Sequence, residues 1–279
     1  MGPAVLWGEC IVIHDDIDDE EERSAINNNS WNSETYAAWI RRFGKPEDVA
    51  GKIIADPMKM LSSLKDQFAD VHGKKILNIM GSNGIKGIAL AVLGAKVTIV
   101  DFSGENKRYA LKVAEAAKAN IAYIQSDILK IKECTQTARF DIAFAEMGIL
   151  HYFTDLQPFM NIIYDILEDG GKFIIKDFHP ISTKLIAYRG STAKVRKYKV
   201  TGDYFDSSIE KVEVAFSKHL PANDDVHYVY IRKWTLGEIV TAVAKAGLII
   251  ESLKEEPNQS SEVFDKGIPK TFTIISKRS

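Results

Sequence analysis

The stretch ILNIMGSNGIKGIALA, residues 76–91, passes from an apolar run through a turn containing glycines into a second apolar run. Glycines between a strand and a helix let the backbone approach a ligand closely, and the first helical turn offers unpaired N–H groups. The stretch therefore favours a strand–turn–helix unit that accommodates a nucleotide-like ligand, with a purely structural turn as the alternative. It fails the dinucleotide fingerprint G-x-G-x-x-G counted from Gly81, because Asn83 and Lys86 occupy positions that require glycine.

Short apolar segments alternate with helical segments from residue 75 onward, a pattern typical of a parallel sheet covered by helices on both faces. The predicted strands are 76–80, 95–101, 121–125, 141–146 and 171–177. Two further strands, 248–253 and 271–277, follow a helix that begins with a capping box at Thr235 and Glu238. We therefore predict an α/β fold with a doubly wound, mostly parallel sheet.

Two segments interrupt this alternation. Residues 15–30 combine an acidic block with an Asn/Ser cluster, so we expect a solvated loop there, followed by helices over 33–43 and from Pro57. We treat residues 1–70 as an N-terminal extension and helical cap, and residues 71–279 as the main domain. Within that domain, residues 181–233 favour a β-rich insert.

Composition narrows the classes of function. The 279 residues include 36 basic and 38 acidic side chains, so no strong positive field attracts nucleic acid, and we expect no nucleic-acid partner. Cys10 and Cys134 lack metal-ligand spacing, which predicts no metal site and a reducing compartment. No apolar run reaches the roughly 20 residues of a membrane helix, and the first residues lack a secretory signal pattern. We expect a cytoplasmic protein with no membrane contact.

Acidic residues follow the predicted strands at positions suited to a nucleoside. Asp101 ends the second strand, where its carboxylate can accept hydrogen bonds from ribose hydroxyls, and Phe102 could lie against an adenine ring. Asp127 follows the third strand and could accept from an adenine amino group. Glu146 ends the fourth strand at the same edge of the sheet. Asp101 and Asp127 could instead cap turns or helices, and Phe102 could be a core residue.

On these residues the sequence resembles the class I S-adenosylmethionine-dependent methyltransferases. The resemblance covers residues 75–180 and the last helix and two strands, through the segments ILNIMGSNG, VTIVDFS, QSDIL and FDIAFAEMGILHYFTDL. It implies a Rossmann-like, seven-stranded sheet whose last strand inserts antiparallel between the fourth and fifth strands. Where the family reads D-x-G-x-G-x-G, this chain has Asn78, Met80, Ser82 and Gly84. This departure allows the turn to run differently.

The resemblance also implies S-adenosylmethionine as cofactor, with S-adenosylhomocysteine as its product, and a set of residues that contact it. Residues 80–84 would line the methionine part, Asp101 would bind the ribose, and residues 146–148 would lie under the sulfonium. The implied cofactor-binding residues are Asn78, Met80, Gly81, Ser82, Asn83, Gly84, Asp101, Phe102, Ser103, Ser126, Asp127, Ile128, Glu146, Met147 and Gly148.

His151 and His179 are the candidate catalytic residues, because they follow the fourth and fifth strands at the edge where a methyl acceptor would lie. A histidine, with an ordinary pKa of about 6.5, can take a proton from an oxygen or nitrogen nucleophile. Either histidine could equally be a structural hydrogen-bonding residue.

The acceptor is expected to be a small molecule. No Asn/Asp-Pro-Pro-Tyr/Phe stretch, which holds a flipped base in amino-group nucleic-acid methyltransferases, follows the fourth strand. The insert at 181–233 is the natural place for acceptor specificity, or for the contacts of a homodimer. Two other functions stay open: a catalytically inactive, cofactor-binding regulatory protein, and an NAD(P)-dependent oxidoreductase that only the α/β pattern supports.

Overall fold

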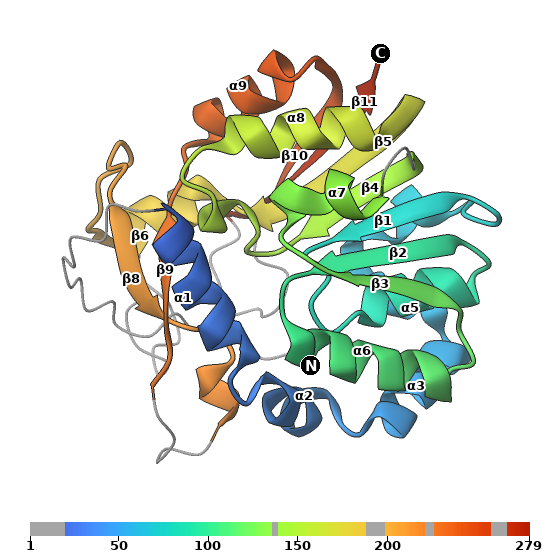
Figure 1. Cartoon of the computed structure of the whole chain (residues 1–279). Helices are drawn as coiled ribbons and strands as arrows, with labels where there is room; N and C mark the ends of the chain where they lie inside the picture. The colour runs from blue at the N-terminus through green and yellow to red at the C-terminus, as the bar shows by residue number, and fades with distance from the viewer. Residues whose placement is uncertain (1–19, 136–138, 188–198, 221–225, 258–266) are drawn as a thin grey trace.

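A seven-stranded sheet forms the centre of the computed structural model, which describes residues 20–135, 139–187, 199–220, 226–257 and 267–279. The strand order is β10-β11-β5-β4-β1-β2-β3, in which β1 to β5 run parallel and β11 runs antiparallel to both its neighbours (Figure 1). The strands are β1 (Lys75–Ile79), β2 (Lys96–Asp101), β3 (Ile121–Gln125), β4 (Phe140–Glu146), β5 (Leu167–Phe178), β10 (Leu248–Pro257) and β11 (Pro269–Arg278). The predicted Rossmann-like fold is confirmed.

The position of β11 corrects one expectation. β11 lies between β5 and β10, not between the fourth and fifth strands, because β4 pairs directly with β5 through Phe144 and Ile174. On its other side β5 pairs with β11, where Ile175 lies opposite Ile274. Helix α8 (Leu156–Ile166) joins β4 to β5, and parallel strands joined by a single crossover helix are usually neighbours. The edge left for a later strand is therefore beyond β5.

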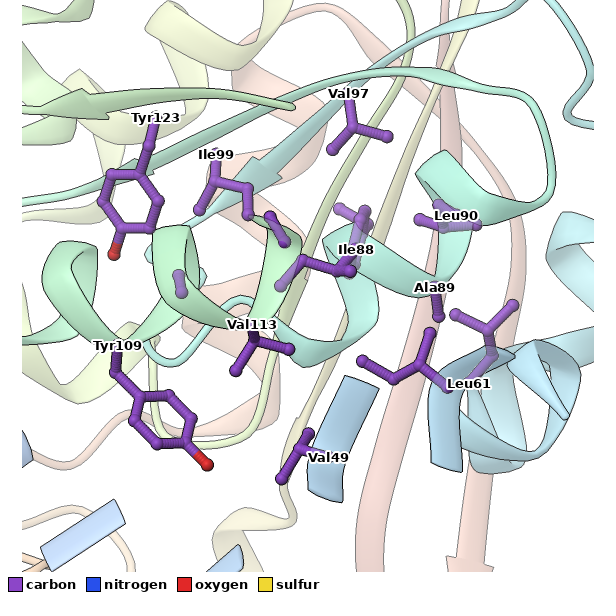
Figure 2. Close-up of a cluster of buried hydrophobic side chains, with 14 of the residues drawn as sticks. Val49, Leu61, Ile88, Ala89, Leu90, Val97, Ile99, Tyr109, Val113 and Tyr123 are labelled. Atoms are coloured by element: carbon purple, nitrogen blue, oxygen red, sulfur yellow. The ribbon is translucent and has the colours of Figure 1, made fainter. Parts of the chain in front are cut away.

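Helices cover both faces of the sheet, because successive strand residues point to opposite sides. Ile76 packs with α3 (Pro46–Ala55), α5 (Ile85–Val92) and α6 (Gly104–Ala116), and Figure 2 shows the buried side chains of this cluster. Leu77 packs on the other face with α8 and α9 (Leu236–Lys245). No helix in the described ranges has both the length and the apolar character needed to cross a membrane.

The N-terminal segment is more ordered than its composition predicted. Residues 15–19 lie outside the described ranges, but α1 (Glu20–Asn32) is a helix, so the expected solvated loop is wrong from residue 20 onward. Asn27 donates to the main-chain oxygen of Tyr230 at 3.0 Å and accepts from its main-chain nitrogen at 2.7 Å. The Ser30 hydroxyl donates to the oxygen of Tyr228 at 2.6 Å. These polar side chains pair with the edge of a strand, which is why a polar helix docks there.

That strand belongs to the insert, which contains two small antiparallel sheets in its described part. β6 (Ile186–Ala187) pairs with β7 (Lys199–Val200), and β8 (Ile209–Glu213) pairs with β9 (Tyr228–Arg232). The predicted β-rich character is present, although the strands are short. The remaining helical elements are α2 (Thr35–Phe43), α4 (Pro57–Met60), α7 (Ile131–Thr135) and the turns η1 (Ser62–Phe68), η2 (Ile128–Lys130), η3 (Leu150–Tyr152), η4 (Ile181–Leu185) and η5 (Ser217–His219).

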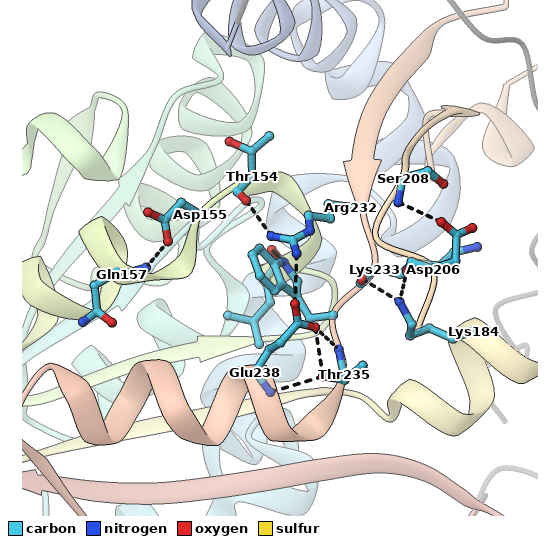
Figure 3. A network of polar contacts seen from close by, with 12 residues as sticks. Thr154, Asp155, Gln157, Lys184, Asp206, Ser208, Arg232, Lys233, Thr235 and Glu238 are labelled. Carbon is cyan, nitrogen blue, oxygen red and sulfur yellow. Dashed lines mark hydrogen bonds and ion pairs between the residues drawn. The ribbon is translucent and has the colours of Figure 1, made fainter. Parts of the chain in front are cut away.

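Polar contacts fix the insert to the sheet domain (Figure 3). Arg232 donates to the main-chain oxygen of Thr154 at 2.7 Å and to the carboxylate of Glu238 at 2.9 Å. Glu238 also completes the predicted capping box with Thr235 at the start of α9. Within the insert itself, the buried Lys184 ammonium donates to the main-chain oxygens of Asp206 and Lys233. The insert is therefore held in place beside the carboxyl edge of the sheet.

Candidate functional site

The turn between β1 and α5 has the backbone course of a glycine motif, although two of its glycines are replaced. Met80, Ser82 and Gly84 have φ values of 46°, 49° and 73°. These are the three positions where the family pattern has glycine, and this left-handed region favours glycine. The replacements have therefore kept the handedness of the turn, with a strain of roughly 1–2 kcal/mol for each non-glycine residue.

Neighbouring strands hold this turn through hydrogen bonds. The Gly81 nitrogen donates to the oxygen of Val100 at 3.1 Å, and the Ser82 nitrogen donates to the carboxylate of Asp101 at 3.0 Å. The Tyr123 hydroxyl, from β3, donates to the Ser82 oxygen at 2.9 Å. Burial raises the pKa of Tyr123 well above its ordinary value, so the hydroxyl keeps its proton. Sequence reasoning missed Tyr123, because nothing local links it to a turn about 40 residues earlier.

Asp101 is the most constrained carboxylate of the site. It is 4% exposed and accepts from the nitrogens of Ser82 and Ser103 and from the side chain of Asn106. Asn106 in turn accepts from the indole nitrogen of Trp39 at 2.8 Å. Burial raises the pKa of Asp101, and the three hydrogen bonds oppose that rise. Because a carboxylate has about four acceptor sites, it retains capacity for a further donor.

Two adjacent cavities lie at the carboxyl edge of the sheet, with volumes of about 720 Å³ and 580 Å³. The larger is lined by Asn78, Met80, Gly81, Ser82, Asn83, Asp101, Phe102, Glu146, Met147 and Gly148, and the smaller by Met80, Phe102, Ser126, Asp127 and Ile128. Both cavities are lined by Met80, Phe102, His151, Tyr152 and Ile231. The structure thus brings most of the expected cofactor residues to these two adjacent cavities, which together are called the crevice below.

Two expected residues line neither cavity. Gly84 packs against α6, where an added Cβ would lie 2.7 Å from the Cβ of Ala110. Ser103 is fully buried, caps α6 and donates its hydroxyl to the oxygen of Trp31 at 2.7 Å. Asp127 does line the smaller cavity, but it also caps η2 by accepting from the Leu129 nitrogen at 2.9 Å. The capping alternative for Asp127 is therefore observed alongside its place in the cavity.

The loop after β4 is shaped by a residue on β5. Met147 and Gly148 both have positive φ, at 62° and 84°. The buried Asp177 carboxylate accepts from the nitrogens of Gly148, Ile149 and Leu150 at 2.6 to 3.0 Å. Asp177 is the last residue of the predicted strand 171–177. The sequence contains no signal for its role, because the contact joins residues about 30 positions apart.

Charged groups of the larger cavity include an ion pair between Glu146 and Lys86 of α5. Glu146 is the first of the three residues, 146–148, that the resemblance puts under the sulfonium. Among the described residues, no group of three or more His, Cys, Asp or Glu side chains is arranged to hold a metal ion.

The two candidate histidines have different surroundings. His151 lines both cavities, and its ring lies 4.5 Å from the ring of Tyr152 between centroids. Burial lowers the pKa of His151 to about 4, opposed in part by the charge of Asp177, so the ring is neutral at pH 7. His179 lines neither cavity; its Nε2 lies 2.6 Å from a Glu255 oxygen, and its Nδ1 accepts from the Ile181 nitrogen. The structure therefore brings only His151 to the crevice.

The N-terminal helices form one wall of the larger cavity, through Trp31 of α1 and Trp39 of α2. The Trp31 indole nitrogen donates to the Tyr152 hydroxyl at 3.0 Å, and burial raises the pKa of that hydroxyl. Asn32 accepts from the Gly104 nitrogen at 2.7 Å, which ties the end of α1 to the start of α6. The expected helical cap is therefore part of the site.

Comparisons with known proteins agree with this geometry. Residues 70–231 match a family described as a methyltransferase domain. A ubiquinone biosynthesis O-methyltransferase from Glaesserella parasuis serovar 5 is 30% identical over 125 residues, which are 44% of this chain and 52% of that protein. A ribosomal RNA small subunit methyltransferase G from a Janthinobacterium species is 24% identical over 132 residues, 43% of this chain and 57% of that protein. The chain spans about half the length of these curated relatives.

A solved structure gives the same fold. The crystal structure of a putative S-adenosylmethionine-dependent methyltransferase from Listeria monocytogenes matches 79% of this chain and 98% of its own, with a TM-score of 0.62 and 22% identity. The match includes most of the chain, so the similarity extends beyond the residues of the family domain.

Proposed function

This chain belongs to the family of methyltransferase domains that its residues 70–231 match, and from that premise we propose that it transfers a methyl group from S-adenosylmethionine to a small-molecule acceptor. The observation that carries the proposal is the pair of adjacent cavities that share Met80, Phe102, His151 and Tyr152 as lining residues. The oxidoreductase alternative rested only on the α/β pattern, which the family match now explains.

The residues that line the two cavities fit the two parts of the cofactor, its adenine and its methionine part. We assign the adenine to the smaller cavity beside Asp127 and Ile128, and the methionine part to the turn over residues 80–84 in the larger cavity. Asp101, which lines the larger cavity, has a free acceptor position for a ribose hydroxyl. The positive φ values at Met80 and Ser82 support this assignment, because they keep the left-handed course that glycine favours in the family's turn.

The cofactor supplies an electrophilic methyl group on a good leaving group, so the chain mainly has to position the acceptor and exclude water. His151 is neutral at pH 7 and can accept a hydrogen bond from the attacking group. A pKa near 4 makes it a weak base, so we assign His151 to orienting the nucleophile rather than to holding its proton. The half-buried ring of Tyr152 restricts the space beside it.

A small acceptor is favoured over RNA by the shape and charge of the site. The larger cavity is lined by aromatic side chains of the N-terminal helices, and the whole chain has a net charge of −2. One relative carries the name of an O-methyltransferase of ubiquinone biosynthesis, and another that of a ribosomal RNA methyltransferase, so RNA is the second candidate.

Labelled methyl transfer distinguishes these candidates. The purified protein is incubated with methyl-labelled S-adenosylmethionine and either the small-molecule fraction of a cell extract or its RNA. We expect label in the small-molecule fraction and none in the RNA. Label in RNA alone would replace the small-molecule proposal with the second candidate. Cofactor binding without labelling of either fraction would favour the inactive regulatory alternative.

A further inference from the structure

The larger cavity is lined by several basic side chains that have no ion-pair partner in the described part of the chain, although the carboxylate of Glu213 also lines it. Four basic residues line it besides Lys86: Arg42, Lys52, Lys59 and Lys218. Within the described ranges, none of these four forms an ion pair with Asp or Glu, whereas Lys86 pairs with Glu146. Since the whole chain is slightly acidic, this local excess of positive charge is not a general property of the surface.

Two of these residues, Arg42 on α2 and Lys218 on η5, lie near each other although they belong to different elements. An Arg42 guanidinium nitrogen lies 3.1 Å from Nε2 of His219, and the guanidinium carbon lies 4.9 Å from the Phe43 ring centroid. Burial and the charges of Arg42 and Lys218 lower the pKa of His219 to about 4, so His219 is neutral and accepts from Arg42. His219 thus positions the guanidinium without cancelling its charge.

The same cavity is also lined by aromatic side chains. They include the side chains of Trp31, Trp39, Phe43, Phe144, Tyr152 and Phe178. Aromatic walls bind planar or apolar groups, while Arg and Lys at a cavity mouth bind carboxylate, sulfonate or phosphate. The cavity therefore offers a ligand both aromatic and cationic contacts.

We infer that the methyl acceptor is an amphipathic anion, with an apolar, ring-containing body in the aromatic part of the cavity and a negative group bound by Arg42 and Lys218. The inference rests on the proposed function and adds the substrate class to it. An anionic group would relieve the repulsion between the two cations, which the described part of the chain leaves uncompensated.

A matched pair of fluorescent probes tests this charge requirement. 8-Anilinonaphthalene-1-sulfonate and N-phenyl-1-naphthylamine share the same rings and differ by the sulfonate. Both are titrated into protein saturated with S-adenosylhomocysteine, so that only the acceptor part stays open. We expect the sulfonate probe to bind about ten-fold more tightly than the neutral one.

The variant R42Q/K218Q is compared with K65Q/K96Q, which removes two exposed positive charges from residues that line neither cavity. We expect R42Q/K218Q to weaken the sulfonate probe about ten-fold and to leave the neutral probe within about two-fold. The control should change neither. All four substituted residues are exposed, and equal melting temperatures would establish that the variants are folded.

Equal affinities for the two probes, or equal losses in both variants, would overturn the inference. Displacement of the sulfonate probe by a single-stranded RNA oligonucleotide, in wild type but not in R42Q/K218Q, would also overturn it, because the cations would then serve a phosphate backbone. Failure of S-adenosylhomocysteine to bind at all would instead contradict the proposed function. The anionic acceptor and the proposed methyltransferase function can therefore be contradicted by different results.

Discussion

Replacing Gly84 by alanine tests how closely the cofactor turn packs against α6. Gly84 has φ of 73°, and a Cβ there would lie 2.7 Å from the Cβ of Ala110, an atom that no side-chain rotation can move. Gly73 has a nearly identical φ of 75°, but its Cβ would have nothing within 4 Å. G73A therefore carries only the left-handed strain, roughly 1–2 kcal/mol. G84A adds overpacking of about 1–3 kcal/mol.

The expected losses of unfolding free energy are thus about 1–2 kcal/mol for G73A and about 2–5 kcal/mol for G84A. Urea unfolding at one pH, followed by circular dichroism, measures both. In an Ala110→Gly background the clash with the Ala110 Cβ is removed and only the movable Ile99 Cδ1, at 3.1 Å, stays close, so the cost of G84A should fall toward that of G73A. Equal losses for G84A and G73A, or no change of the G84A cost in that background, would refute the reasoning.

Three other substitutions test separate contacts. N27A removes both hydrogen bonds that Asn27 makes with the buried main chain of Tyr230, so we expect a loss of about 2–4 kcal/mol in urea unfolding; a loss below about 0.5 kcal/mol would contradict the docking of α1. The folded pKa of His151, about 4, lies below the ordinary 6.5, so its stabilising effect is present above pH 6.5 and is lost as the pH falls toward 4. H151Q should therefore reduce the pH dependence of the free energy of unfolding by up to about 3 kcal/mol. Parallel pH dependences in the wild type and the variant would argue against this. W39F leaves the Asn106 oxygen without its donor, and calorimetry should then show S-adenosylhomocysteine affinity reduced about three- to ten-fold rather than unchanged.

Local sequence signals predicted the strands and most of the crevice, because strand ends and glycine turns are short-range features. Asp101 and Glu146 were placed at the correct edge for this reason. The capping box at Thr235 was equally local and is confirmed. The assignment of these residues to the cofactor stays a prediction that a bound structure has to test.

Long-range contacts explain what the sequence could not give. The polar helix α1 exists because Asn27 pairs with a strand about 200 residues later, which its composition could not indicate. His151 and His179 both follow strands, so the sequence offered no reason to prefer one of them. The contact of His179 with Glu255 on β10, which is distant in the sequence, distinguishes the two. The place of β11 likewise depends on which sheet edge is left after β4 and β5 pair.

The central claim is that Asp101 and the turn over residues 80–84 hold the methyl donor. Calorimetric titration of S-adenosylhomocysteine into the wild-type protein and into D101N tests it most directly. The account predicts one micromolar site in the wild type and an affinity at least about ten-fold weaker in D101N, which loses a charged acceptor. No binding to the wild type, or equal binding to both proteins, would contradict it.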